Sequence, residues 1–69
     1  MGFVLMSLGE KLRSLRESKG LTMKELAEKL GVDRTSVSAW ERDRTTPNYD
    51  MLIKICSVLS CEINELSRV

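Results

Sequence analysis

The sequence predicts an all-α domain of five short helices, and three observations lead to this fold class. Apolar residues recur at spacings of three and four along nearly the whole chain, as on one face of a helix. Residues that start and stop helices divide the chain into short segments, and no alternating strand pattern is present. A chain of 69 residues forms one domain, expected at 7–69 after an apolar arm at 1–6.

The first two helices carry the same start signal. Ser7 and Glu10 form a capping box, in which the serine oxygen accepts one unpaired N–H and the glutamate accepts another. Thr22 and Glu25 repeat this pattern at the second helix. Each helix is expected to end at a glycine in the left-handed conformation. These glycines are Gly20 and Gly31.

The third helix is expected over residues 34–42, with Asp33 as its N-cap. It has two apolar anchors, Val37 and Trp40, which lie on one face. Most of its other positions are polar. The outer face of such a helix is either ordinary solvated surface or a surface that recognises a ligand.

The fourth helix is expected over residues 49–59, with Asn48 as its N-cap, and it is the most apolar segment of the chain. A short fifth helix is expected over residues 63–67, with Leu66 pointing into the core. The polar stretch that ends at the single proline forms the loop between the third and fourth helices.

Residues 23–40 have the spacing of a helix-turn-helix. Two helices that cross steeply need a small residue where they approach, and Ala27 fits that place. The turn needs a positive φ, which Gly31 adopts at little cost. Val37 and Trp40 anchor the second of the two helices, so its remaining surface is forced outward.

These residues resemble a known family. The run LTMKELAEKLGV at 21–32 is similar to the second helix of phage-repressor and Cro-type proteins, also called the Xre family, and RTSVSAWER at 34–42 is similar to their recognition helix. The resemblance extends from about Ser7 to Leu66. It implies a lambda-repressor-like fold with the helix-turn-helix at helices 2 and 3. It also implies a dimer that binds operator DNA and acts as a repressor, or sometimes as an activator.

Three positions depart from the family pattern. Met23 replaces a frequent glutamine and removes a polar contact to DNA. Asp43 replaces a glycine after the recognition helix and adds negative charge near the DNA. Ser60 replaces a glycine before the last helix. The resemblance also implies an ion pair between Arg16 and Glu41 that orients the recognition helix.

The motif and the resemblance together predict the DNA contacts. Side chains on the outer face of a recognition helix reach base edges. The expected base contacts are Arg34, Thr35, Ser38 and Ala39. Groups at the start of the second helix and in the loop after the third are expected beside phosphates. They are Thr22, Met23, Lys24, Arg42, Arg44 and Thr46. The alternative for both sets is ordinary solvated surface.

Three side chains near this surface leave alternatives open. Trp40 could stack on a base, but it shares a face with Val37 and is expected in the core. Ala39 either touches a thymine methyl or is a spacer. Tyr49 either packs against the domain or presents its hydroxyl to a phosphate.

The last third of the chain is expected to form a two-fold contact, because it is more apolar than its own core requires. The predicted interface consists of Val58, Ile63, Leu66 and Val69, with Leu66 shared between core and interface. The expected partners are therefore a second copy of the chain and double-stranded DNA. A regulatory protein partner is also compatible with the sequence.

Composition excludes several other classes of protein. The chain has no histidine and only two cysteines, so no metal, cofactor or catalytic site is expected. The i, i+5 spacing of Cys56 and Cys61 is not expected to bring their thiols together. No apolar run is long enough to span a membrane, and we expect a cytoplasmic protein. The net charge of only +1 favours one rival, a protein-interaction module of the same fold such as an antitoxin.

Overall fold

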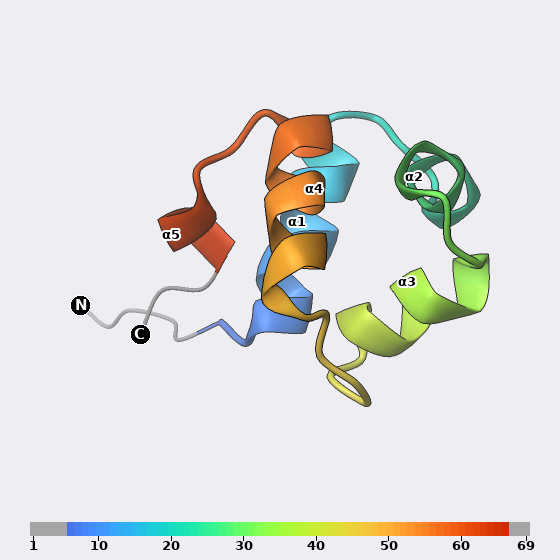
Figure 1. Cartoon of the computed structure of the whole chain (residues 1–69), viewed down its shortest axis with the longest axis horizontal. Coiled ribbons are helices and arrows are strands. Elements are labelled where there is room, and N and C mark those ends of the chain that lie inside the picture. The colour runs from blue at the N-terminus through green and yellow to red at the C-terminus, as the bar shows by residue number, and fades with distance from the viewer. Residues whose placement is uncertain (1–5, 67–69) are drawn as a thin grey trace.

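The computed structural model describes residues 6–66, which contain five helices and no strand. The helices are α1 (Leu8–Ser18), α2 (Met23–Leu30), α3 (Arg34–Glu41), α4 (Tyr49–Leu59) and α5 (Ile63–Leu66). The all-α fold class is therefore confirmed. In Figure 1, α4 lies in front of α1 in the middle of the molecule, α2 and α3 form the right-hand end, and α5 lies at the left. No helix within the described range is long and apolar enough to cross a membrane.

The two capping boxes form as the sequence predicts. The Ser7 hydroxyl accepts the Glu10 N–H at 3.1 Å, and the Glu10 carboxylate accepts the Ser7 N–H at 2.9 Å. Thr22 and Glu25 make the same two bonds at 3.0 and 2.9 Å. Both glycines that end these helices have positive φ. They are Gly20 at +70° and Gly31 at +76°.

The N-terminal ends of α3 and α4 differ in how they are capped. The Asn48 side chain accepts the Met51 N–H at 2.8 Å and caps α4 as predicted. Asp33 occupies the N-cap position of α3 with extended backbone, but its side chain makes no capping hydrogen bond. The predicted N-cap position of Asp33 is therefore confirmed, although its side chain does not hydrogen-bond to the first turn. Helix α3 ends at Glu41, and Arg42 is its C-cap.

The core lies between the packed helices, with α3 against α1 and α2 and with α4 against α2 and α5, and it holds both anchors of the helix-turn-helix. Val37 is fully buried and Trp40 is 8% exposed, which places the indole in the core. Ala27 is 2% exposed where α2 packs against α3, as predicted. The buried apolar residues are Leu12, Leu26, Ala27, Leu30, Val37, Trp40, Leu52, Ile55, Cys56, Leu59 and Leu66.

The N-terminal end of α1 touches the C-terminal end of α3 at Gly9. A Cβ atom at Gly9 would lie 2.5 Å from the carbonyl oxygen of Trp40 and 2.5 Å from that of Glu41. Only glycine allows two backbones to approach this closely. This contact, which sequence analysis did not find, fixes the position of α3 against α1.

Candidate nucleic-acid interface

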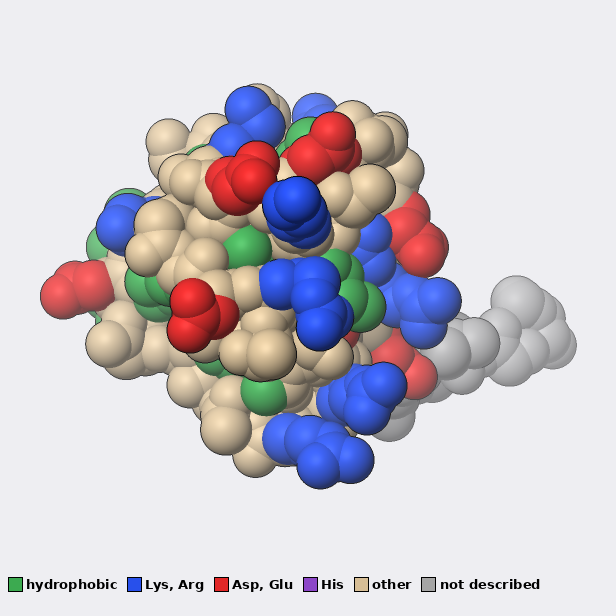
Figure 2. Space-filling view, turned by 90° about the vertical axis from the view of Figure 1, so that its right-hand side faces the viewer, with side chains coloured by type: hydrophobic (Ala, Val, Ile, Leu, Met, Phe, Trp, Pro, Cys, Tyr) green, Lys and Arg blue, Asp and Glu red, His purple; other side chains and the backbone are tan. Residues whose placement is uncertain are grey.

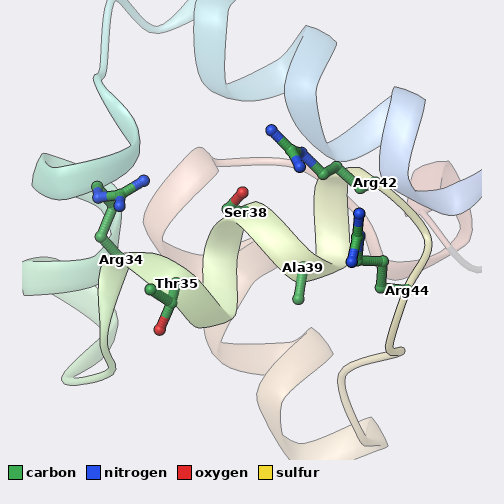
Figure 3. Close-up of a pocket in the computed structure, with 6 residues that line it drawn as sticks. All are labelled: Arg34, Thr35, Ser38, Ala39, Arg42 and Arg44. Atoms are coloured by element: carbon green, nitrogen blue, oxygen red, sulfur yellow. The ribbon is translucent and has the colours of Figure 1, made fainter.

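The outer face of α3 and the turn after it form an open groove with a volume of about 220 Å³. Its lining comprises all four predicted base-contacting residues and two predicted phosphate-contacting ones. They are Arg34, Thr35, Ser38, Ala39, Arg42 and Arg44. Figure 3 shows arginines at both ends of the groove and short side chains between them. The groove exists because the two core anchors turn this face of α3 outward.

Two parallel rows of side chains make up the floor of the groove. Arg34, Ser38 and Arg42 follow one another at spacings of four, which places them in one row along the helix. Thr35 and Ala39 form the neighbouring row. A guanidinium group offers donors that match the acceptor edge of guanine, a hydroxyl donates or accepts, and a methyl group contacts thymine. The groove therefore has the chemistry needed to distinguish base pairs.

Three arginines gather at the groove although the net charge of the chain is only +1. Figure 2 views the end that carries α2 and α3, and basic side chains follow one another down its middle and lower right. Arg34, Arg42 and Arg44 are exposed, and none of them pairs with a carboxylate within residues 6–66. Their charges are therefore available to an anionic ligand.

Asp43 lies between two of these arginines, and its carboxylate is already engaged. Its backbone is left-handed, with φ of +59°. Its Oδ1 accepts the Gly9 N–H at 2.9 Å, in the first turn of α1. A helix N-terminus favours a negative charge. The Asp43 charge, which the sequence places near the DNA, is thus bound to the start of α1, and the bond also tethers the turn that carries Arg42 and Arg44.

The N-terminus of α2 leaves two backbone donors available. The capping box satisfies the N–H groups of Thr22 and Glu25. The N–H groups of Met23 and Lys24 donate to no group within the described part of the chain. Donors at a helix N-terminus are suited to a phosphate. The Met23 side chain packs against the core, so the backbone remains as its polar contact.

A buried ion pair fixes the orientation of α3. Arg16 Nε donates to Glu41 Oε2 at 2.6 Å, and Arg16 Nη2 donates to Glu41 Oε1 at 3.0 Å. Arg16 Nη1 also donates to the Leu21 carbonyl oxygen at 2.8 Å. The hydrogen bond with Glu41 raises the pKa of Arg16 above its ordinary value, against the opposing effect of burial. The predicted pair is confirmed, and it joins α1, the α1–α2 turn and the end of α3.

Two other residues predicted at this interface lie on the surface. Thr46 is exposed, directly before the buried Pro47. Tyr49 is 63% exposed, which excludes the alternative in which it packs into the domain. Its hydroxyl is accessible at the first position of α4.

The structure divides the residues predicted for a dimer contact. Val58 and Ile63 are half-buried, with part of each side chain on the surface. Leu66 is 1% exposed, so it belongs to the core and has no surface to share with a partner. Val69 lies outside the described residues. Within residues 6–66, no cluster of three side chains could hold a metal ion.

Comparison with known proteins identifies the family. A family model described as helix-turn-helix matches residues 12–66, which include the core anchors and the whole groove. The chain belongs to the Xre-type helix-turn-helix family. This membership agrees with the resemblance carried by α2 and α3, and it accounts for the five-helix fold.

Several relatives of this family member are named regulators of transcription. The transcriptional activator BcrR of Enterococcus faecalis is 44% identical over 88% of this chain. The solved P22 c2 repressor in complex with a synthetic operator has a TM-score of 0.85 and 29% identity, covering 90% of this chain and 94% of that one. The regulator SinR in complex with DNA has a TM-score of 0.81 and 34% identity, covering 87% and 97%.

The chain is shorter than the curated relatives it matches. It spans 30% of the length of BcrR and 54% of the length of SinR from Bacillus subtilis. The likeness therefore concerns the helix-turn-helix part of these proteins.

Proposed function

We propose that this chain binds double-stranded DNA at a specific sequence and regulates transcription from that site, with α3 in the major groove. One observation carries the proposal: the outer face of α3 is an open groove with arginines at both ends and short side chains between them, and these arginines pair with no carboxylate of residues 6–66. The solved repressor–operator complex with the same fold supports this placement. A major groove admits one α-helix, and its base edges offer the acceptors and donors that such a face can match.

In this proposal the two sets of residues have different tasks. Arg34, Thr35, Ser38 and Ala39 contact base edges and give sequence preference. The arginines after α3, together with Thr46 and the N-terminus of α2, contact phosphates and set the register on the duplex. At the start of α2, the contact comes from the Thr22 hydroxyl and the N–H groups of Met23 and Lys24.

We propose repression as the regulatory outcome, in the cytoplasm, where a bound dimer would block access to a promoter. The named relatives include an activator as well as repressors. The position of the operator relative to the promoter therefore decides whether transcription is repressed or activated. A reporter placed behind the selected operator tests this directly. Repression predicts a reporter signal that falls as the protein is expressed.

Two arginine variants separate base reading from phosphate contact. Arg34→Ala is expected to weaken binding to the preferred site by about 10- to 100-fold and to relax preference at one base pair. Arg44→Ala is expected to weaken binding to every sequence alike and to reduce the salt slope by about one unit. Fluorescence anisotropy with specific and scrambled duplexes, at several salt concentrations, measures both effects.

The matched control is Arg13→Ala, because Arg13 is exposed on α1 and pairs with Glu17 outside the groove. This variant is expected to bind like the parent. If Arg34→Ala weakened binding to all duplexes equally, its assignment to base reading would be wrong. If the control lost as much affinity as Arg44→Ala, the groove would not be the binding surface.

The proposed regulator is a homodimer, because one recognition helix covers too few base pairs for strong discrimination. The contact includes the half-buried Val58 and Ile63 and leaves the α3 groove free. Ile63→Lys is expected to shift the monomer–dimer equilibrium toward monomer by at least tenfold, which sedimentation over a range of concentrations measures.

Ile53→Lys is the control for the dimer. Ile53 is 48% exposed and lies on α4, outside the predicted contact. It is expected to leave the dimer intact, and thermal melts check that both variants fold. A parent that remains monomeric at high concentration would contradict the dimer. Loss of the dimer in the control alone would move the contact to the outer face of α4.

A further inference from the structure

The end of α4 brings together the two cysteines. Ser60 has φ of 55° and ψ of 44°, which is left-handed. This turn allows the Cys61 N–H to donate to the Cys56 carbonyl oxygen at 3.0 Å. That hydrogen bond belongs to the Schellman ending of a helix, in which the side chains of the two bonded residues commonly meet. The spacing by itself does not bring the thiols together, and the left-handed turn at Ser60 does so.

The surroundings of the pair differ for its two members. Both cysteines are free thiols. Cys56 is 8% exposed and belongs to the core, whereas Cys61 is half-buried against it. Burial and, second, a hydrogen bond with the Cys56 thiol are the main causes that raise the pKa of the Cys61 thiol to about 12. Glu65 of α5 also raises this pKa, and Lys19 at the end of α1 lowers it.

We propose that Cys56 and Cys61 are a disulfide-forming pair that reacts with small disulfides such as oxidised glutathione while α4 keeps its conformation. The more exposed Cys61 thiolate attacks the oxidant, whose S–S bond breaks, and one glutathione thiolate leaves and takes up a proton. The Cys56 thiolate then displaces the second glutathione from the mixed disulfide. Two protein thiols are oxidised to one disulfide, and one oxidised glutathione is reduced to two thiols.

The bond would close a short loop around the turn between α4 and α5. Helix α5 packs on both α4 and α1, so the disulfide would covalently fix the turn that holds α5 against the rest of the domain. Cross-linking restricts the unfolded chain, and a loop of this size is expected to raise Tm by about 9–18 °C.

The reaction should be slow at neutral pH and accelerate steeply in base. Only a thiolate attacks a disulfide. Because the Cys61 pKa is about 12, its thiolate fraction rises about tenfold per pH unit between pH 7 and 10. The first-step rate is expected to follow that slope.

The test treats the whole chain with oxidised glutathione at pH 9 and follows mass and free thiols with time. The expected product is a chain that is lighter by two hydrogens and not disulfide-linked to a second chain, formed at a rate that is independent of protein concentration, with the raised Tm. Cys56→Ser and Cys61→Ser are the matched controls. Cys56→Ser is expected to stop at a glutathione adduct, and Cys61→Ser, which keeps only the buried Cys56, is expected to react far more slowly than the parent. Stable glutathione adducts or disulfide-linked dimers of the parent would overturn the proposal. An unchanged Tm of the chain that carries the internal disulfide would also overturn it.

Discussion

Glu41→Gln is expected to lower the free energy of unfolding by about 3–5 kcal/mol, the largest effect of any single change considered for this domain. The substitution keeps the shape of the side chain but removes the charge that faces Arg16. Both residues are buried, so the guanidinium would lose its buried counter-ion and keep only the exposed Glu17 carboxylate, 4.0 Å from Nη2. Chemical denaturation followed by circular dichroism measures the loss.

The control for this prediction removes both charges. In the double variant Arg16→Met with Glu41→Leu, no charge remains buried, and the loss is expected to be far smaller than in Glu41→Gln. Glu17→Gln breaks the exposed pair with Arg13 and is expected to cost under about 1 kcal/mol. Equal losses in the single and double variants would contradict the role assigned to the ion pair.

Gly9→Ala is expected to cost about 3 kcal/mol, the upper end of the range for overpacking. The new methyl group would meet two backbone carbonyl oxygens of α3, and backbone atoms cannot rotate away as a side chain can. The sign of the stability change is informative, because replacing glycine with alanine within a helix ordinarily stabilises the helix by about 1 kcal/mol. Thermal and denaturant melts measure the change.

Ser14→Ala is the matched control on the same helix, at an exposed position. It is expected to leave stability unchanged or to raise it slightly. A Gly9→Ala variant more stable than the parent would show that α1 and α3 can separate without loss. In that case the close approach would not position the groove.

The local part of the fold could be predicted because its signals lie within a few residues of one another. Capping boxes and the following glycines fix the ends of α1 and α2 with contacts three to five residues apart. The outward face of α3 could also be predicted, since Val37 and Trp40 leave it no other orientation. These two kinds of signal were enough for the fold and for the residues of the groove.

The remaining features depend on contacts between distant parts of the chain. The bond from Gly9 to Asp43 joins residues 34 positions apart, and no local pattern indicates it. Sequence analysis therefore placed the Asp43 charge near the DNA without finding its bond to α1. The meeting of the two cysteines depends on the left-handed Ser60, a residue that rarely adopts this conformation. Leu66 was divided between core and interface because spacing alone does not reveal how deeply a short last helix packs.

Selection from random duplex DNA, followed by affinity measurements at about 150 mM salt, tests the central claim most directly. Binding by the α3 groove predicts an enriched sequence with two related half-sites about 34 Å apart. It also predicts that this site binds at least about 1,000-fold more tightly than a scrambled duplex. No enriched sequence, or equal affinity for the selected and scrambled duplexes, would contradict it.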